Sequence, residues 1–432
     1  MVEISPFKGI TYNKEKIQNL DKVMSPPYDI ISENMQTTLY EKDPYNFVRL
    51  ILGKQYPEDS EENNRYTRAS ELFNDWLQKS ILVPSEKCMI YPYKIDYKLD
   101  NKSKTMNGFF VLLKLDSNYK YVKAHERTLS KPKADRLNLM KACNAHLEPI
   151  QLLYIDDNDF IRKTIDETLN NPMINVKGYD GFTHRLWKLE NKEVINEIIN
   201  DLKDKTLFIA DGHHRYQTAI NFANEKIKSG ESKKDSPFNY QMVILANMYD
   251  EGLAILPTHR FIKMPNVDIK DLINRIEKYF TVEEFVPINR NPKETSEEII
   301  NKLKTEDKHK FAMHIKNKYY ILTLKDEKVM DKFASEKSKT WRTLDVSILH
   351  KIILEHIMGI DESNLEDHIK YTRVDSETIE FVDKDKFDMS FLMNATKIEQ
   401  LRKIAEAGEH MPQKSTYFLP KMLSGLVMYK MQ

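Results

Sequence analysis

The densest group of side chains capable of chemistry follows a short apolar stretch that ends at Ala210. This group consists of Asp211, Gly212, His213, His214 and Arg215. The pattern predicts a strand that ends at Ala210, a turn at the glycine and a helix from about His214 to Ile227. The N–H groups of the first helical turn and the cationic side chains would together attract an anion, above all phosphate.

Two of these residues suggest distinct roles. Arg215 could bind a phosphate group through two N–H groups, and Asp211 could bind magnesium or accept a proton. The alternative is that Asp-Gly forms an ordinary turn and Arg215 a surface cation. We favour the functional interpretation, because two adjacent histidines beside an arginine are costly in ordinary packing. Since no further ligands follow at metal-binding spacing, the histidines do not predict a structural zinc site.

A second polar group lies where a predicted strand, Tyr119–Leu129, gives way to a loop. Its members are His125, Glu126, Thr128, Lys131 and Arg136. Glu126 could act as a general base. The hydroxyl and the two cations, from Thr128, Lys131 and Arg136, could contact phosphate oxygens. The same residues could equally form a solvated run of charges, and their spacing does not decide between the two interpretations.

A third group is the pair His259 and Arg260, in the predicted strand Leu253–Ile262, which Pro257 interrupts. A lone histidine–arginine pair is usually structural. Here the pair repeats the strand-then-His-Arg arrangement of the first group, which favours a phosphate-binding role.

The C-terminal region offers a compact set of donors, which are Lys414, Ser415, Thr416 and Lys421. Gly408 and Lys414 stand at the spacing of a P-loop. A P-loop is nevertheless rejected, because glutamine replaces its second glycine and a predicted helix, not a strand, precedes it. A substrate-binding loop and a basic surface loop explain these donors equally well.

Near the N-terminus, Tyr28 and Asp29 follow two consecutive prolines, Pro26 and Pro27. The prolines fix the backbone and would hold the two side chains in place. This arrangement is mostly structural in proteins. We keep Tyr28 and Asp29 as candidates for substrate binding.

The composition narrows the class of protein. The 432 residues carry 66 Lys plus Arg against 66 Asp plus Glu, and this balance argues against a basic shell for nucleic acid. Two cysteines fit a reducing compartment, so we expect a cytoplasmic protein. We recognise no signal peptide, and no apolar run approaches the ~18 residues of a membrane span.

The elements that must position these residues alternate between strands and helices. They predict an α/β or α+β fold with a mixed-sheet core. Further along the chain, Phe311–Ile315 and Tyr319–Leu324 predict a hairpin, and Asp268–Phe280 predicts a helix. The chemistry-rich motifs thin out after residue 262. We therefore expect a catalytic region over residues 1–262 and a smaller α/β region over 263–432 that contributes the Lys-Ser-Thr loop.

Five ordered motifs carry a family resemblance. They are Ser25–Ile31, His125–Thr128 with Lys133–Arg136, Ile209–Ala219, Leu256–Arg260 and Met411–Lys421. Together they resemble an uncharacterised prokaryotic family, domain of unknown function 1015. The resemblance spans nearly the whole chain, but the family carries no established reaction.

The Asp211–Arg215 box is also similar to the phosphate-binding box of the ParB/sulfiredoxin superfamily, which includes an ADP-dependent free-serine kinase. This resemblance implies a ParB/sulfiredoxin-like nucleotide-binding unit. It implies that Gly212 and Arg215 bind phosphate and that His213 or His214 assists. The identity of the base does not carry over. Cys143 lacks the surroundings of the sulfiredoxin cysteine, and we recognise no helix-turn-helix, so those two activities are disfavoured.

The leading hypothesis is a nucleotide-dependent phosphotransferase that acts on a small hydroxylated metabolite, with free L-serine as the first candidate. It would use Mg²⁺ held by Asp211, a nucleotide that is ATP or ADP with CTP as a further alternative, and Glu126 as the base. The expected partner is a small molecule, without nucleic acid or membrane, and a homodimer is left open. Two alternatives are a nucleotide-hydrolysing switch or nucleic-acid-binding protein, and a nucleotide-independent phosphoester hydrolase.

Overall fold

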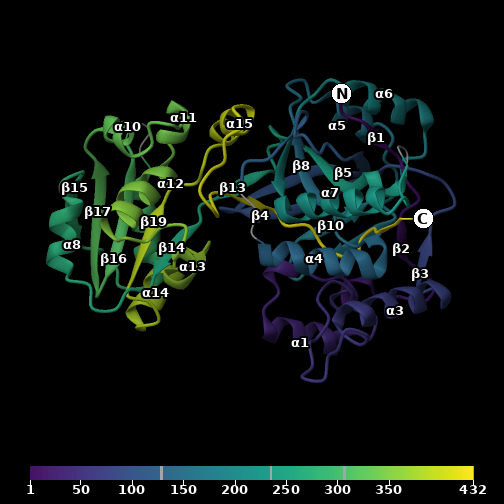
Figure 1. Ribbon diagram of the computed structural model, residues 1–432, viewed down its shortest axis with the longest axis horizontal. Coiled ribbons are helices and arrows are strands. Elements are labelled where there is room, and N and C mark those ends of the chain that lie inside the picture. The colour runs from purple at the N-terminus through teal and green to yellow at the C-terminus, as the bar shows by residue number, and fades with distance from the viewer. Residues whose placement is uncertain (127–129, 234–235, 305–307, 432) are drawn as a thin grey trace. The chain divides into compact units, whose positions relative to one another are not determined.

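The computed structural model describes residues 1–126, 130–233, 236–304 and 308–431. They form two compact units, which are described separately (Figure 1). Unit 1 contains Met1–Ala124, the described residues from 130 to Ala254, and the C-terminal segment from Pro420. Unit 2 contains His125, Glu126 and the described part of Ile255–Leu419. The division after Ala254 and the return of the chain at Pro420 differ from the single boundary after residue 262 that the sequence predicted.

Unit 1 is built on a mixed sheet. Its strands lie in the order β6 (Val122–Lys123), β11 (Leu207–Asp211), β8 (Ile150–Tyr154), β12 (Tyr240–Asn247), β5 (Lys102–Lys114), β4 (Tyr91–Leu99), β10 (Thr183–Leu186) and β9 (Ile174–Lys177), and β1 (Ile4–Ser5) also pairs with β5. β8 runs parallel to β12 and β6 runs parallel to β11, whereas β5 runs antiparallel to both of its neighbours in this order, β12 and β4. This sheet confirms the predicted mixed-sheet class.

The main core of unit 1 explains why these segments form strands. Val111 and Leu113 of β5 and Val243 and Leu245 of β12 are two residues apart, so each pair faces the same side of the sheet. All four are buried in one apolar layer. Three helices cover it with apolar side chains, and these are α5 (Phe160–Asp166), α6 (Lys192–Leu202) and α7 (His213–Lys228).

The other helices of unit 1 are α1 (Glu33–Lys42), α2 (Val48–Ile51), α3 (Arg65–Gln78) and α4 (Ser130–Cys143). α4 packs against both α3 and α7. Two short ladders complete the unit, β2 (Ile10–Tyr12) with β3 (Leu82–Pro84) and β7 (Ala145–His146) with β21 (Tyr429–Lys430). Through β21 and the bridge from Ser424 to Ser25, the C-terminal segment joins elements from the N-terminal half.

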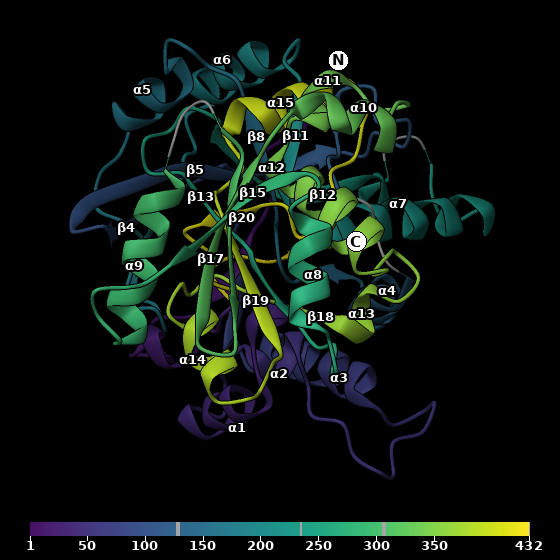
Figure 2. The same cartoon turned by 90° about the vertical axis from the view of Figure 1, so that its left-hand side faces the viewer.

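Unit 2 contains an antiparallel sheet, on which Figure 2 gives a facing view. Its strand order is β15 (Phe280–Phe285), β17 (Lys318–Leu324), β16 (Lys310–Ile315), β19 (Met389–Met393), β14 (His259–Ile262) and β18 (Ile369–Thr372). β16 and β17 form the predicted hairpin. Pro257 does interrupt the predicted strand 253–262, which becomes β13 (Ala254–Leu256) and β14.

The helices of unit 2 are α8 (Ile269–Ile276), α9 (Pro292–Leu303), α10 (Met330–Phe333), α11 (Lys339–Arg342), α12 (Asp345–Ile348), a π-helical segment (Leu349–Ile357), α13 (Leu365–His368), α14 (Glu377–Asp383) and α15 (Ile398–Glu406). Of these, α8, α9, α13 and α14 contact strands of the sheet. α9 and α14 share an apolar cluster with Ala312, Ile321 and Leu392 of the sheet (Figure 2).

Two predicted elements were wrong in extent. The predicted helix 268–280 ends at Ile276, because Phe280 pairs with Leu324 in the β15–β17 ladder. The predicted strand 119–129 is reduced to Val122–Lys123 within the described residues, and the carboxylate of Asp116 accepts the N–H groups of Tyr121 and Val122 there. In the part of the chain that the structure describes, every helix is too short or too polar to cross a bilayer.

Candidate functional site

The site in unit 1 begins where β11 meets α7. β11 ends at Asp211, and α7 starts at His213, which confirms the predicted strand, turn and helix. Gly212 has a left-handed conformation, with φ of 97°, and a Cβ atom there would lie 3.1 Å from Arg215 Nε. The left-handed backbone therefore favours glycine, and any other side chain would also have to displace the Arg215 side chain slightly. The first turn of α7 directs its N–H groups toward this point.

Asp211 lies between two cations. Arg215 Nη2 donates to Asp211 Oδ2 at 2.6 Å, and Lys421 Nζ donates to Asp211 Oδ1. Arg215 Nη1 also donates to the carbonyl oxygen of Pro149. The guanidinium that was predicted to bind phosphate is thus held by protein acceptors, and a two-point contact with phosphate would require it to exchange them.

A second buried group lies in the same unit and centres on Glu148. Its Oε1 accepts hydrogen bonds from the N–H of Tyr28 at 3.2 Å and from the hydroxyl of Ser424 at 2.7 Å. Its Oε2 lies 3.7 Å from Arg136 Nη1. The Arg136 guanidinium lies 3.9 Å from the centre of the Tyr28 ring and donates to the carbonyl oxygen of Ile51. Arg136, a predicted phosphate ligand, therefore links the N-terminal turn to this carboxyl group.

Burial sets the electrostatics of this group. Removal from water raises the pKa of Glu148 above its usual value, although the charges of Arg215 and Arg136 oppose the shift. Burial also raises the pKa of the Tyr28 hydroxyl to about 12. Arg215 connects the two groups, since its charge acts on Glu148, Tyr28 and Asp29 as well as on Asp211.

The raised pKa of Glu148 predicts a pH-dependent contribution to stability. The folded state binds this proton more tightly than the unfolded state, whose reference pKa is 4.5. The stabilisation is therefore complete below that value and is lost as the pH rises through the folded pKa. We expect Glu148→Gln to gain stability relative to the wild type as the pH increases from 4.5 to neutral. Urea unfolding of both proteins across this range measures the difference, and a difference independent of pH would contradict the prediction.

Unit 2 holds a separate group around Arg260, which is 1% exposed. Its guanidinium donates to the carbonyl oxygens of Thr258, of Lys414 at 3.2 Å and of Gln413 at 3.5 Å. Burial lowers its pKa to about 10. The predicted phosphate ligand Arg260 therefore fixes the loop that carries Lys414.

His259 is also fully buried. Its Nε2 donates to Asp375 Oδ1 at 2.7 Å, and its Nδ1 accepts the N–H of Met393 at 3.2 Å. Both ring nitrogens are engaged with the protein. The phosphate-binding role of His259 stays a prediction that this position does not favour.

The loop of Lys414, Ser415 and Thr416 lies beside His125 and Glu126, the first residues of the second polar group that the sequence indicated. Lys414 has a positive φ of 53° and is exposed, whereas Ser415 is buried and its hydroxyl donates to the carbonyl oxygen of Pro412. Thr416 Oγ1 hydrogen-bonds with His125 Nε2 at 3.1 Å. Glu126 forms a β-bridge with Met411 and lies close enough for its charge to act on Arg260.

The predicted residues thus fall into two sets. Unit 1 holds Tyr28, Asp29, Arg136, Asp211, Gly212, His213, His214, Arg215 and Lys421, and unit 2 holds Glu126, His259, Arg260, Lys414, Ser415 and Thr416. His213 is buried, His214 is half-buried, and Asp29 is exposed. Thr128 lies outside the described residues, as does the side chain of Lys131. The roles of both remain predictions.

Sequence reasoning missed Glu148 and Ser424. Glu148 stands between apolar Leu147 and the Pro149–Tyr154 stretch that becomes a buried strand. A lone carboxylate at the entrance to a buried strand was the available signal, because such a group must find hydrogen-bond donors. Ser424 gave no comparable signal, since its role depends on the return of the C-terminal segment.

Magnesium fits this arrangement poorly. Each oxygen of Asp211, the predicted ligand, bonds to a cation, Lys421 or Arg215, and these two positive charges would repel a metal ion. No group of three or more His, Cys, Asp or Glu side chains in the described ranges has an arrangement that could hold a metal ion. We therefore derive no step through a protein-held metal ion.

Comparison with known proteins confirms the family resemblance. The profile of the family described as "Protein of unknown function (DUF1015)" matches residues 4–347. The chain belongs to this family. The match ends before the segment 411–421. Lys421 of that segment bonds to Asp211, and the carbonyl oxygens of Gln413 and Lys414 accept hydrogen bonds from Arg260. A comparison with curated proteins gives no match for this DUF1015 chain.

Several solved structures show a distant similarity to this chain. A variant of free serine kinase in complex with ADP is similar at 14% identity and a TM-score of 0.36, over 72% of this chain and 87% of that chain. A conserved hypothetical protein from Pyrococcus furiosus is similar at 14% identity and 0.34, over 72% and 90%. SbnI from Staphylococcus aureus, with a C-terminal truncation, is similar at 11% identity and 0.36, over 73% and 85%.

Proposed function

We propose that unit 1 of this DUF1015 protein is a nucleotide-dependent phosphotransferase for a small hydroxylated metabolite. One observation carries the proposal. Lys421 and Arg215 converge on the two oxygens of Asp211 at the N-terminus of α7, so two cations surround one carboxylate at the positive end of a helix. This local excess of positive charge suits a phosphate group better than a neutral ligand.

The residues of unit 1 would have separate roles in phosphoryl transfer. The N–H groups of the first turn of α7 and the ammonium group of Lys421 would hold phosphate oxygens and stabilise charge on them. Arg215 would keep its bond to Pro149 and position the carboxylate of Asp211. During the reaction the bond from phosphorus to the nucleotide oxygen breaks, and a bond from phosphorus to the acceptor oxygen forms.

The proton of the acceptor hydroxyl requires a base, and Asp211 and Glu148 are candidates because the charges of both act on Arg215. Asp211 is the more accessible, with 21% of its side chain exposed against 5% for Glu148. Because a base must first reach the proton, we assign the transfer to Asp211. Glu126, the base that the sequence suggested, belongs to unit 2, and its role stays a prediction.

A product assay tests the proposal. The protein is incubated with magnesium, L-serine and each of ATP, ADP and CTP, and phosphoserine is sought by mass spectrometry. L-serine is the first acceptor because the Asp211–Arg215 box resembles that of the free-serine kinase. We expect one nucleotide to yield product and Asp211→Asn to yield at least about 100-fold less, as for loss of a general base. Nucleotide loss without an acceptor would favour the switch, and no turnover with any acceptor would contradict the proposal.

A further inference from the structure

A cavity of about 830 Å³ lies within unit 2, apart from the groups described above. Its walls come from β15, the two residues before β16, the end of β17, the turn that follows, α10 and α11. Thr281 and Thr323, which are directly opposite each other in the β15–β17 ladder, face it from the sheet. The volume falls within the range of pockets that bind small molecules, about 300–1,000 Å³.

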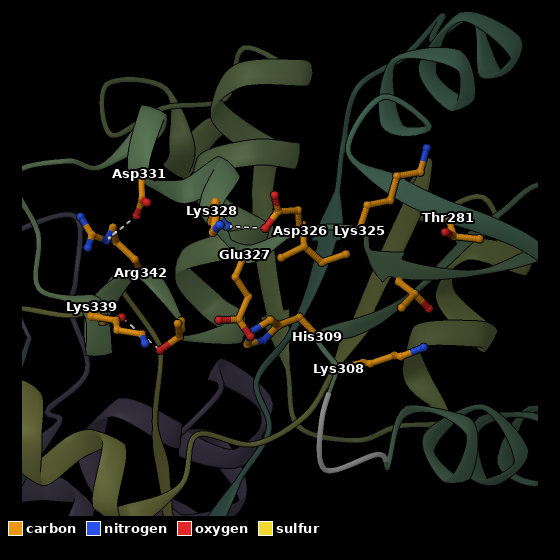
Figure 3. A pocket seen from close by; sticks show the side chains of 13 residues that line it. Thr281, Lys308, His309, Lys325, Asp326, Glu327, Lys328, Asp331, Lys339 and Arg342 are labelled. Atoms are coloured by element: carbon orange, nitrogen blue, oxygen red, sulfur yellow. Dashed lines mark hydrogen bonds and ion pairs between the residues drawn. The ribbon is translucent and has the colours of Figure 1, made fainter.

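The lining of this cavity is rich in cations. They are Lys308, Lys325, Lys328, Lys339 and Arg342. Figure 3 shows His309 and Glu327 at the centre of the view, with Lys328, Lys339 and Arg342 on one side and Lys308 and Lys325 on the other. Cations therefore line both sides of His309 and Glu327, although the ammonium groups of Lys308 and Lys325 point away from the centre of the view.

The acidic residues of the lining are committed to protein partners. Asp331 pairs with Arg342 at 3.2 Å, and Asp326 accepts the N–H of Lys328 at 2.9 Å. Glu327 lies 3.4 Å from His309. The five cations of the lining against its three carboxylates leave a formal net charge of +2, before the charge of His309 is counted.

Three cations of the lining form no ion pair with any residue that the structure describes. They are Lys308, Lys328 and Lys339, the uncommitted lysines of the cavity. Lys325, in contrast, donates to the carbonyl oxygen of Glu277. The uncommitted lysines supply a positive charge that a multiply charged anion would balance.

His309 adds a donor at the centre. Its Nδ1 bonds with Asp345 at 2.6 Å on the protein side, and its Nε2 faces Glu327 at the longer distance of 3.4 Å. Although burial lowers the pKa of His309, the bonds to Asp345 and Glu327 raise it overall, which favours the doubly protonated ring. Glu327 is 54% exposed, so its carboxylate occupies a position on Nε2 that a ligand anion could take over.

We propose that this cavity is a second binding site, for a small organic phosphate with two or more negative charges. The uncommitted lysines hold the phosphate oxygens, and the ligand displaces Glu327 from His309. The geometry therefore makes opposite predictions for two kinds of variant. Loss of a lysine weakens binding, whereas loss of the charge of Glu327 strengthens it.

Calorimetric titration of the full chain with pyrophosphate tests the proposal. We expect Lys328→Met and Lys339→Met each to weaken binding about two- to fivefold, the size of one exposed charge contact. Glu327→Gln should strengthen it by a similar factor. Lys332→Met is the matched control, because Lys332 is an exposed lysine of α10 outside the lining, and it should change nothing.

The ligand class is tested with citrate, which carries similar charge on carboxylates. Weaker binding of citrate than of pyrophosphate supports a phosphate site, whereas equal binding overturns the phosphate preference. Weaker pyrophosphate binding by Glu327→Gln, or unchanged binding by both lysine variants, overturns the site itself.

Since the α7 site is also expected to bind phosphate, the titration is repeated in Lys421→Met. Pyrophosphate binding that persists in this variant and falls with the lysine variants supports the second site. Binding that disappears with Lys421→Met, and not with the cavity variants, overturns the second site and leaves the proposed phosphotransferase intact. If the cavity binds pyrophosphate but the protein catalyses no phosphoryl transfer, the proposed function fails and this inference stands.

Discussion

We expect Lys421→Met to lower phosphoryl transfer about 100- to 1,000-fold, the cost of removing one preorganised donor from a developing charge. Lys421 is 8% exposed and bonds to Asp211 Oδ1 at the N-terminus of α7. Methionine keeps most of the side-chain volume but removes the charge. Steady-state measurement of kcat and KM for the nucleotide checks the prediction, and we expect the larger change in kcat.

The fold should survive this substitution. Asp211 keeps its bond to Arg215 and is partly exposed, so the stability loss should be about 1–3 kcal/mol, between the values for exposed and for buried ion pairs. Lys94→Met is a matched control, since Lys94 belongs to unit 1, has 19% of its side chain exposed and pairs with Asp166 at 2.7 Å. It should lose a similar ion pair without loss of turnover. Equal turnover in Lys421→Met and the wild type would remove Lys421 from the site.

The strand, turn and helix that carry Asp211–Arg215 were largely predictable because their signals are local. The apolar run before Asp211, the single glycine and the helical spacing after it specify a strand, a left-handed turn and a helix without long-range information. The hairpin of β16 and β17 was predictable for the same reason. Lys316 and Asn317, the two residues between its strands, both adopt positive φ, as a tight hairpin turn requires.

The partners of the charged residues could not be predicted. Sequence shows that Arg215 and Arg260 are cations, but it does not show that carbonyl oxygens of Pro149 and of Lys414 accept their hydrogen bonds. Those acceptors belong to the backbone, so no residue type marks them. The result is that two arginines assigned to ligand binding hold protein segments in place.

Contacts between segments far apart in the sequence also could not be predicted, because no local pattern marks them. Lys421 reaches Asp211 across 210 positions of sequence, because the C-terminal segment rejoins unit 1. The two strands of its ladder, β7 and β21, are two residues each and carry no periodicity long enough to recognise. A boundary drawn from the density of motifs could not anticipate this return.

Arg260→Ala should destabilise unit 2 by about 3–5 kcal/mol, the range for truncating a large buried side chain to alanine. The substitution opens a cavity at a side chain that is 1% exposed, and it leaves the carbonyl oxygens of Thr258, Gln413 and Lys414 without their donor. Urea unfolding measures the loss. Arg290→Ala, at an exposed position of the same unit, should stay within about 0.5 kcal/mol of the wild type.

The same variant distinguishes the two roles considered for Arg260. If the residue fixes the loop 411–416, hydrogen exchange in that loop should accelerate without any ligand, because its carbonyl oxygens lose their anchor. If Arg260 instead serves mainly to bind phosphate, exchange of the ligand-free loop should be unchanged, and only nucleotide affinity should fall. The full burial of the guanidinium and its bonds to backbone oxygens favour the first result. A guanidinium already occupied by carbonyl acceptors has few donors left for a ligand.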